Sequence, residues 1–497
     1  MTAKHLSLWA LPLMLYQTAK NWLWLVLVGG FGVIKGGVAW WQLVVFAAAL
    51  VLGLAAVGLR YWRFTYVLEP KQLTINSGLF VKKIRHIPYA KIQTLERQQW
   101  FFMQPFGLEA VSIETASKDG KQGEGTLLAV PLSVADTIEA RRHLEPAPQA
   151  VPDEAVAPML EAPDASYQIN SHDLHLYALT SLGFLPLLAV LGTIYNRVDD
   201  VLPKAWENDA AEALAQLAAV AIIGLTVFIL VVAILISYLS LIARYWHFTL
   251  TKRASTLTAT RGFFKRNTVS VRLKRIQAAR LRQSLLRQWL HLTTVQAITA
   301  SNAADNEADN DLVLMPVVQT PQAAATMHRF IDWLPAELPS FLLIPAANRW
   351  LYSRNLVLGN LLVVVPAGMA VGVFKRQWLP AALVIAAVWL IVAALQGRYA
   401  ATHSGVAVID GERLAVSAGT GWSYTQYLLR RQNIQALTLA NTIWMAPKHR
   451  VHLRLHIRRG DNDLTIAVRY LDRATAQQVQ DWYRPADAGK KIWFSEK

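Results

Sequence analysis

The chain has 497 residues, enough for about three domains of typical size. Its composition excludes an ordinary soluble globular protein, because 54% of the residues are hydrophobic and only 16% are charged, against about 25% charged in soluble domains. The absence of cysteine excludes disulfides, thiolate zinc sites, cysteine-ligated iron–sulfur clusters and cysteine nucleophiles. The formal net charge of +16 suits a partner that is either nucleic acid or an anionic membrane surface.

Six long apolar runs predict membrane-spanning helices, since about 20 apolar residues cross the hydrocarbon of a bilayer. The runs form three pairs with brief connections, which indicates three helical hairpins: 22–34 with 40–59, 174–194 with 214–242, and 356–374 with 378–395. The first run is short for a span. Residues 6–16 precede it and predict an interfacial helix that is not cleaved, because no A-x-A-like site follows to support a signal peptide.

The charge of the connecting segments predicts the orientation of these spans. The connection 195–213 carries a net charge of −3, whereas the segments 243–354 and 396–497 carry +9 and +7. Lys and Arg are enriched in cytoplasmic segments. We therefore expect a multi-pass protein with both termini and the three large segments in the cytoplasm.

A repeat organises the large segments. Arg60-Tyr61-Trp62-Arg63-Phe64-Thr65 follows the first hairpin, and Arg244-Tyr245-Trp246-His247-Phe248-Thr249 follows the second, 184 residues later. A more divergent third copy begins at Arg398. The same order recurs in all three copies at a glycine and at an Ile-Gln pair, which we take as the repeat core: Gly78, Ile92 and Gln93; Gly262, Ile276 and Gln277; Gly419, Ile434 and Gln435.

Within each copy, apolar and polar residues alternate, which predicts β-strands with one face exposed to water. The predicted strands are 64–68, 73–75, a strand ending at 87, 92–98, 111–115 and 127–132; 256–260, 268–273, 294–300 and 312–318; and 406–409, 413–417, 451–457 and 464–468. A helix closes each copy, at 133–144 with Ser133 as its N-cap, at 320–334 and at 472–483. An antiparallel sheet of this kind needs closed or covered edges, so we expect a small barrel or sandwich.

The fold class is therefore α+β, with three transmembrane hairpins that each precede an antiparallel domain. The expected organisation is an interfacial helix and hairpin at 1–59, a domain at 60–145, a Pro-, Ala- and acid-rich linker at 146–172, a hairpin at 173–243, a domain at 244–335, a hairpin at 348–396 and a divergent domain at 397–485.

Short recurring segments carry a family resemblance. They are Gly78-Leu79-Phe80, Ile87-Pro88-Tyr89-x-Lys91-Ile92-Gln93, Phe106-Gly107-Leu108 and Lys274-Arg275-Ile276-Gln277. These segments resemble the bacterial pleckstrin-homology-like (PH-like) domain family, and the triplicate arrangement resembles its YdbT-like three-domain membrane proteins. The resemblance implies barrels or split barrels with a C-terminal helix, a cytoplasmic location of the domains at a bacterial plasma membrane, and no established enzymatic activity. The second copy departs by having Val271-Arg272-Leu273 in place of Ile87-Pro88-Tyr89, so the copies are not expected to share one ligand.

Motifs for catalysis are absent from the sequence, which contains no H-E-x-x-H, P-loop, G-x-S-x-G or G-x-G-x-x-G pattern. His449, His452 and His456 lie close together, but Arg450 and Arg454 among them disfavour a metal cation. The apolar runs contain almost no charge, which argues against a transporter. We therefore expect no enzyme activity, no cofactor and no metal site.

Basic residues near the predicted spans are the candidate site. They are Arg60, Arg63, Lys82, Lys83, Arg85, Arg244, Lys265, Arg266, Lys274, Arg275 and Arg398. Each Lys or Arg close to an anionic leaflet contributes about 1 kcal/mol to membrane binding. The same charges also serve solubility and topology, and nucleic acid is disfavoured because aromatic residues are not interleaved with them. We expect a membrane scaffold that binds anionic lipid or a partner protein at the inner leaflet; an accessory subunit of a cell-envelope membrane complex is the alternative.

Overall fold

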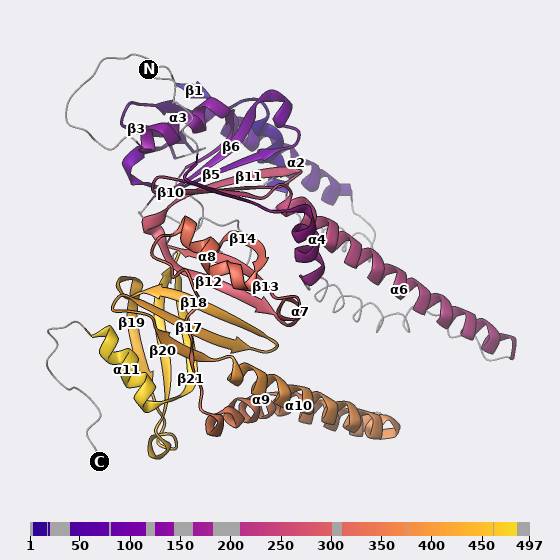
Figure 1. Ribbon diagram of the computed structural model, residues 1–497. Coiled ribbons are helices and arrows are strands. Elements are labelled where there is room, and N and C mark those ends of the chain that lie inside the picture. The colour runs from indigo at the N-terminus through magenta and orange to yellow at the C-terminus, as the bar shows by residue number, and fades with distance from the viewer. Residues whose placement is uncertain are drawn as a thin grey trace.

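The computed structural model describes residues 3–16, 18–19, 40–78, 81–115, 125–143, 163–181, 209–300, 311–374, 376–460 and 462–484. Figure 1 shows three β-rich repeats stacked one after another, with long helices projecting from one side of the stack. The predicted span 22–34 lies outside the described residues, as do Leu79 and Phe80.

Among the described residues, each repeat contains seven strands in the same order, with a helix after the last strand. Repeat 1 comprises β1 (Lys4–His5), α2 (Trp40–Arg63), β2 (Thr65–Leu68), β3 (Gln72–Ser77), β4 (Lys83–Pro88), β5 (Ile92–Trp100), β6 (Leu108–Thr115), β7 (Gly125–Pro131) and α3 (Leu132–His143). Repeat 2 comprises β8 (Ala165–Gln168), α4 (Ser171–Thr180), α6 (Asp209–Tyr245), β9 (Thr249–Arg253), β10 (Thr256–Arg261), β11 (Lys265–Arg272), β12 (Ile276–Ser284), α7 (Leu285–Trp289), β13 (Leu292–Thr299), β14 (Leu312–Gln319) and α8 (Thr320–Phe330).

Repeat 3 comprises β15 (Leu342–Leu343), α9 (Ala346–Phe374), α10 (Leu379–Thr402), β16 (Gly405–Val408), β17 (Arg413–Thr420), β18 (Ser423–Arg430), β19 (Ile434–Ala440), β20 (Arg450–Arg459), β21 (Asn462–Asp472) and α11 (Arg473–Tyr483). The predicted strands are confirmed in position. Within the described part of the chain, the alternation did not predict seven further strands, which are β1, β8, β9, β12, β15, β18 and β19. Asp472 caps α11 by accepting a hydrogen bond from the backbone of Ala474. The N-cap prediction for Ser133 is wrong, because α3 begins at Leu132 and Ser133 lies inside its first turn.

The sheets do not coincide with the repeats. Each repeat contributes two half-sheets, and the second half-sheet of one repeat pairs edge to edge with the first half-sheet of the next. The resulting sheets have the strand orders β1-β2-β3-β4, β7-β6-β5-β11-β10-β9-β8, β14-β13-β12-β18-β17-β16-β15 and β19-β20-β21, all antiparallel. Pairing between repeats therefore replaces the expected closure of each sheet on itself, and it covers one edge of each of β5, β11, β12 and β18.

The hydrophobic cores, in contrast, are each centred on one repeat. In repeat 2, Leu257 and Val269 from one sheet pack with Val295 and Leu314 from the next, and all four are almost fully buried. The core of repeat 1 is built in the same way from its own two half-sheets. The other two cores also take residues from the neighbouring repeat, with Ala407, Ala415 and Leu428 of repeat 3 in the core of repeat 2, and Ala278 and Ile298 of repeat 2 in the core of repeat 3. Each repeat is thus a split barrel around one main core, and the sheet shared by repeats 2 and 3 contributes to a core on each of its faces.

Short segments that precede the long helices belong to the β-domains. β1, β8 and β15 pair with β2, β9 and β16, respectively. Leu6, Ala10 and Leu13 are buried in the core of repeat 1, so the predicted interfacial location of 6–16 is replaced by packing within a domain. The predicted linker also ends earlier than 172, because β8 and the start of α4 lie within it.

Three helices among the described residues are long and apolar enough to cross a membrane. They cover Val227–Tyr245, Ala346–Phe374 and Arg376–Thr402. α9 and α10 form a helical hairpin in repeat 3. The two helices approach closely at Gly397, because the Cβ of an alanine there would lie 2.4 Å from Ser353 Cα. The predicted run 174–194 begins in α4, whose Leu174 and Tyr177 are buried in the core of repeat 2, and residues 182–194 lie outside the described part.

Candidate functional site

The strands give each repeat a proximal end, next to its helices, and a distal end. Around repeat 2, the turn after β10 returns to the end of α6, where Gly262 N donates to Trp246 O at 3.0 Å and Phe263 N donates to Ala243 O at 2.8 Å. At the opposite end, Leu273 N donates to Ser255 O at 2.8 Å. We call the turns at the helix end the proximal face; it comprises residues 62–63, 81–82, 101–107, 244–247, 262–266, 285–291, 421–422 and 441–449. The long helices leave all three repeats on one side of the stack, so the proximal face lies on that side in each repeat (Figure 1).

Large apolar side chains are exposed on the proximal face. Trp444 is 86% exposed, Trp289 is 71% exposed and Phe101 is 59% exposed. The full set of exposed apolar residues there is Trp62, Val81, Phe101, Phe106, Trp246, Phe263, Phe264, Trp289, Leu290, Ile443 and Trp444. Because turns in water are normally polar, exposed aromatic residues at every repeat indicate an interface, and aromatic side chains favour the boundary between lipid and water. These exposed residues were not predicted from the sequence. Phe and Trp in segments between predicted strands would have indicated them.

Two glycines of the repeat core shape this face. Gly78 and Gly262 have φ of +114° and +110°, and an added Cβ would lie 1.9 Å from Val81 O and 2.1 Å from Lys265 O. Only glycine accepts such a turn. Gly419 has a different role, because its missing Cβ allows Ala400 O of α10 to approach.

The other repeat-core residues divide into two groups. Ile92, Ile276 and Ile434 are all buried. Gln93 is buried, Gln277 is half-buried and Gln435 is exposed, so the glutamine does not lie in the core of the third repeat.

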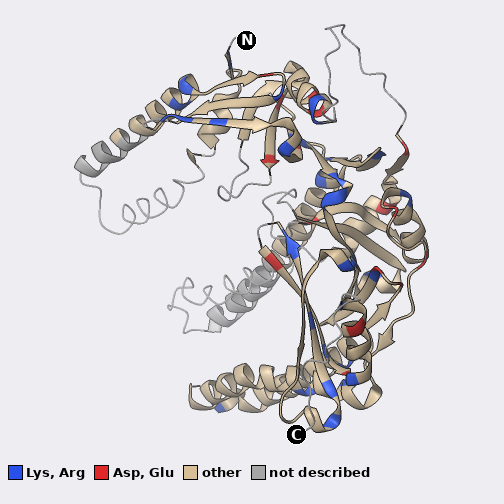
Figure 2. Cartoon of the chain, turned by 90° about the vertical axis from the view of Figure 1, so that its left-hand side faces the viewer, with Lys and Arg blue, Asp and Glu red and all other residues tan. Residues whose placement is uncertain are grey.

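Most of the predicted basic residues lie at or near the proximal face. Arg60, Arg63 and Arg244 are exposed at the ends of α2 and α6, and Arg398 is exposed near the end of α10. Lys82 and Arg266 are exposed, Lys83 begins β4, and the Lys265 ammonium lies 5.3 Å from the centre of the Trp100 ring. Figure 2 shows Lys and Arg on all three repeats, including the sheet end of α2.

Three predicted basic residues lie away from the proximal face. Lys274 and Arg275 belong to the short 3-10 helix Leu273–Arg275 at the distal end, so the structure does not bring them together with the others; Arg85 lies in the middle of β4. Burial, together with Arg458 and Arg272 nearby, lowers the pKa of Arg275. Buried Arg142, beside Arg272, has its pKa lowered to about 10, mainly by burial.

Two histidines of β20 contact polar groups of the neighbouring strand β21. His452 Nδ1 lies 3.1 Å from the donating backbone N of Tyr470, and His456 Nδ1 lies 2.7 Å from Asp463 Oδ2. The described residues contain no cluster of three or more His, Cys, Asp or Glu side chains that would hold a metal ion.

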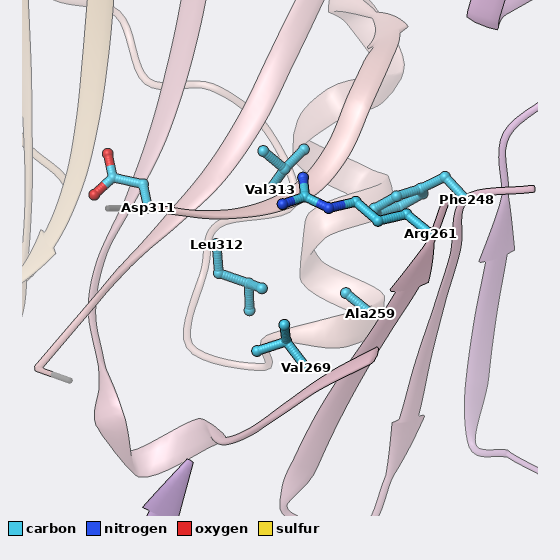
Figure 3. Close-up of a pocket in the computed structure, with 7 residues that line it drawn as sticks. All are labelled: Phe248, Ala259, Arg261, Val269, Asp311, Leu312 and Val313. Carbon is cyan, nitrogen blue, oxygen red and sulfur yellow. The ribbon is translucent and has the colours of Figure 1, made fainter. Parts of the chain in front are cut away.

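A small hollow between β10, β11 and the start of β14 is not a ligand site. Figure 3 shows Arg261 and Phe248 on one side of it, and Asp311 pointing away from them. Its cavity volume of about 10 Å³ holds roughly one water molecule. Asp311 forms ion pairs with Arg280 at 2.7 Å and Arg459 at 2.8 Å. These residues therefore connect repeats 2 and 3.

Comparisons with known proteins agree with this architecture. The chain is similar to the UPF0699 transmembrane protein YdbT of Bacillus subtilis (strain 168), with 24% identity over 456 residues, which covers 88% of this chain and 90% of that protein. No solved structure matches the chain. The family model described as bacterial PH domain matches three times, at residues 23–147, 210–332 and 355–487. The protein is therefore a transmembrane member of the bacterial PH domain family with three tandem copies of the domain.

Proposed function

We propose that the protein is a non-enzymatic scaffold of the bacterial plasma membrane, whose three PH-like domains lie on the inner leaflet with their proximal face. Six spans in three hairpins anchor it, and both termini are cytoplasmic. Anionic lipid head groups bind along the proximal face, which also positions the domains for partner proteins.

The observation that carries the proposal is the pairing of exposed aromatic and basic residues on one side of all three repeats. Phe263, Phe264 and Arg266 illustrate it, since all three are exposed at one turn beside the end of α6. The helices hold these turns at the leaflet, within the Debye length of about 8 Å over which anionic lipids act. Aromatic rings then enter the head-group region while the cations contact phosphate.

Depth in the membrane tests the orientation of the proximal face. Because the chain contains no cysteine, Trp444→Cys in the full-length protein accepts a single environment-sensitive dye. In nanodiscs we expect blue-shifted emission that spin-labelled lipids quench. The control is Lys71→Cys, at the distal end, which should remain in a water-like environment. Equal quenching at both positions would contradict the proposed orientation.

Charge neutralisation tests lipid binding. The variant Lys82→Gln/Lys83→Gln/Arg266→Gln/Arg398→Gln removes four charges at or near the proximal face, and the control Lys71→Gln/Lys91→Gln/Arg253→Gln/Lys274→Gln removes four exposed distal charges. Native mass spectrometry of detergent-solubilised full-length protein counts bound phosphatidylglycerol and phosphatidylcholine. We expect the proximal variant to lose phosphatidylglycerol selectively, and equal retention by the two variants would refute the lipid role.

The second candidate function is that of an accessory subunit in a cell-envelope membrane complex. The exposed, mixed apolar and basic proximal face also suits another membrane protein. Crosslinking in intact membranes followed by affinity purification in mild detergent distinguishes the two functions. A stoichiometric foreign partner supports the accessory role, and lipid retention without such a partner supports the scaffold.

A further inference from the structure

The stack of repeats ends in two unpaired strand edges. β11 and β18, the fourth main strands of repeats 2 and 3, pair with β5 and β12 of the preceding repeat. Their equivalent in repeat 1 is β4, and the equivalent of β5 and β12 in repeat 3 is β19. Within the part of the chain that the structure describes, no strand pairs with the outer edge of β4 or of β19.

We call the pairing of β5 with β11 the first join and the pairing of β12 with β18 the second join. Both joins have the same register. Thr94 pairs with Val271 in the first join, and Ala278 pairs with Leu429 in the second. Ala278 is 184 residues beyond Thr94, and Leu429 is 158 residues beyond Val271; these are the same offsets that relate Ile92 to Ile276 and Ile276 to Ile434. The join is therefore a reproducible interface that the chain already forms twice.

The end strands expose positions that the joins bury. Gln93 and Thr94 are 5% and 1% exposed, whereas the equivalent Gln435 and Ala436 of β19 are exposed. On the other side, Ser270 of β11 is 1% exposed, whereas its equivalent His86 in β4 is exposed. β4 thus exposes the edge that β11 and β18 use in the joins, and β19 exposes the edge that β5 and β12 use.

The side chains of the two edges determine which pairing is favoured. β19 contains neither charge nor proline, the features by which exposed strand edges avoid association. β4 carries Lys83 and Arg85 and ends at Pro88, so pairing between two β4 strands would oppose cationic side chains. Pairing of β19 with β4 opposes none and repeats the geometry of the internal joins.

We propose that β19 of one molecule pairs with β4 of a second copy of this chain, in the register of the internal joins. That register places Leu437 opposite His86, and Leu439 opposite Ile84. Because the long helices leave the same side of the stack (Figure 1), a second molecule added in this way keeps its spans in the same bilayer. The interface is heterologous, so repetition generates a ring or a membrane-bound filament.

An exposed apolar residue supports this register. At the first join, Phe101 N donates to Phe264 O at 2.8 Å and the two rings lie 6.5 Å apart. Ile443 occupies the position equivalent to Phe101 in repeat 3 and is 86% exposed. In the proposed interface it lies next to the start of β4 of the next molecule and is covered.

Cysteine crosslinking of the full-length, cysteine-free chain tests the proposal in membranes. Membranes from cells that coexpress the Ile84→Cys and Leu439→Cys proteins should give an oxidised dimer, and neither protein should crosslink when expressed alone. A single chain with both substitutions should give a ladder or a closed ring. The out-of-register pair Ile84→Cys and Thr438→Cys should crosslink about tenfold less, because side chains on opposite faces of a sheet point apart.

Several outcomes would overturn the proposal. They are absence of the mixed dimer, a dimer of either single-cysteine protein alone, equal crosslinking of the out-of-register pair, or crosslinking of Leu439→Cys to a different protein. A second measurement uses Ala436→Lys, which places a charge on the β19 edge. We expect its mass in detergent, measured by light scattering, to fall to that of the monomer, whereas Thr465→Lys on β21 should leave the oligomer unchanged. These results are independent of phosphatidylglycerol retention, so failure of the interface and failure of the lipid role are distinguishable.

Discussion

The two joins between repeats share one backbone register but differ in their side chains. At the first join, Asn267 donates to Glu96 at 3.1 Å, and Ser270 donates to Glu139 of α3 at 3.0 Å. At the second join, the fully buried Asp311 carboxylate links Arg280 and Arg459. Backbone pairing thus sets the geometry of a join, whereas the side chains determine how strongly each join depends on a single residue.

The largest expected effect is at the second join. Asp311→Ala leaves Arg280 and Arg459 without their shared carboxylate, and loss of one partner of a buried ion pair costs about 3–5 kcal/mol. Denaturant unfolding in detergent, with limited proteolysis between repeats 2 and 3, measures this loss. The control is Asp332→Ala, which breaks the Lys252–Asp332 pair at 2.6 Å; because Asp332 is 76% exposed, its loss should cost less than about 1 kcal/mol. Equal effects would show that the buried network does not hold the second join.

The turns that lead into β11 and β18 are compared by two glycine substitutions. Gly262→Ala forces a Cβ to 2.1 Å from Lys265 O at a φ of +110°, which should cost about 3 kcal/mol. Gly421→Ala, at a φ of +58° with no atom within 4 Å of the new Cβ, should cost about 1–2 kcal/mol. The midpoints of thermal unfolding give the order. A smaller effect at Gly262 than at Gly421 would contradict the requirement for glycine in the first turn.

The polar contacts of the joins have smaller expected effects. Asn267→Ala removes a buried hydrogen bond to a carboxylate and should destabilise the first join by about 2 kcal/mol. Asn433→Ala removes a hydrogen bond of 2.8 Å to Gln277 O at the second join and should cost about 1 kcal/mol. Hydrogen exchange of β11 and β18 reports each join separately. Exchange that increases in both strands for either variant would show that the joins open together.

The smallest expected effect is a pH dependence of stability at His452, which lies in β20 of the last half-sheet and not at a join. Burial, with Arg469 and Arg454 nearby, lowers the pKa of His452. The folded state therefore favours the neutral ring, whose contribution to stability is present above the pKa of the unfolded state, about 6.5, and is lost as the pH falls below it. We expect β20 to exchange faster at pH 5 than at pH 7 relative to β12, and His452→Gln to reduce the difference. An unchanged pH dependence in that variant would assign it to another group.

The sequence predicted the positions of many strands but not which strands pair with each other across repeats. Alternation located β3, β6 and β20, because the buried and exposed faces of those strands differ in polarity. β12 and β18 were not predicted, because pairing on both edges and contact with cores on both sides leave little contrast between their faces. The short strands β1, β8 and β15 are too brief to show a period.

The candidate site was also predicted in part. The basic residues near the helices were found because Lys and Arg beside apolar runs are visible in the sequence. The exposed aromatic residues of the proximal face were not found, because Phe and Trp in an apolar chain suggest a core, even though Phe101 and Trp444 lie between predicted strands. Lys274 and Arg275 looked similar to the other basic residues, yet the direction of β11 carries them to the distal end.

The sequence alone determined the membrane class, the triplication and the family, since these depend on hydrophobic runs, charge bias and recurring segments along one chain. Only the tertiary structure determined that half-sheets of neighbouring repeats combine, because strand pairing joins backbone groups regardless of side-chain identity and leaves no residue pattern of its own. The same physical reason hid the two unpaired edges at β4 and β19, which become apparent only when the equivalent strands are seen to be paired.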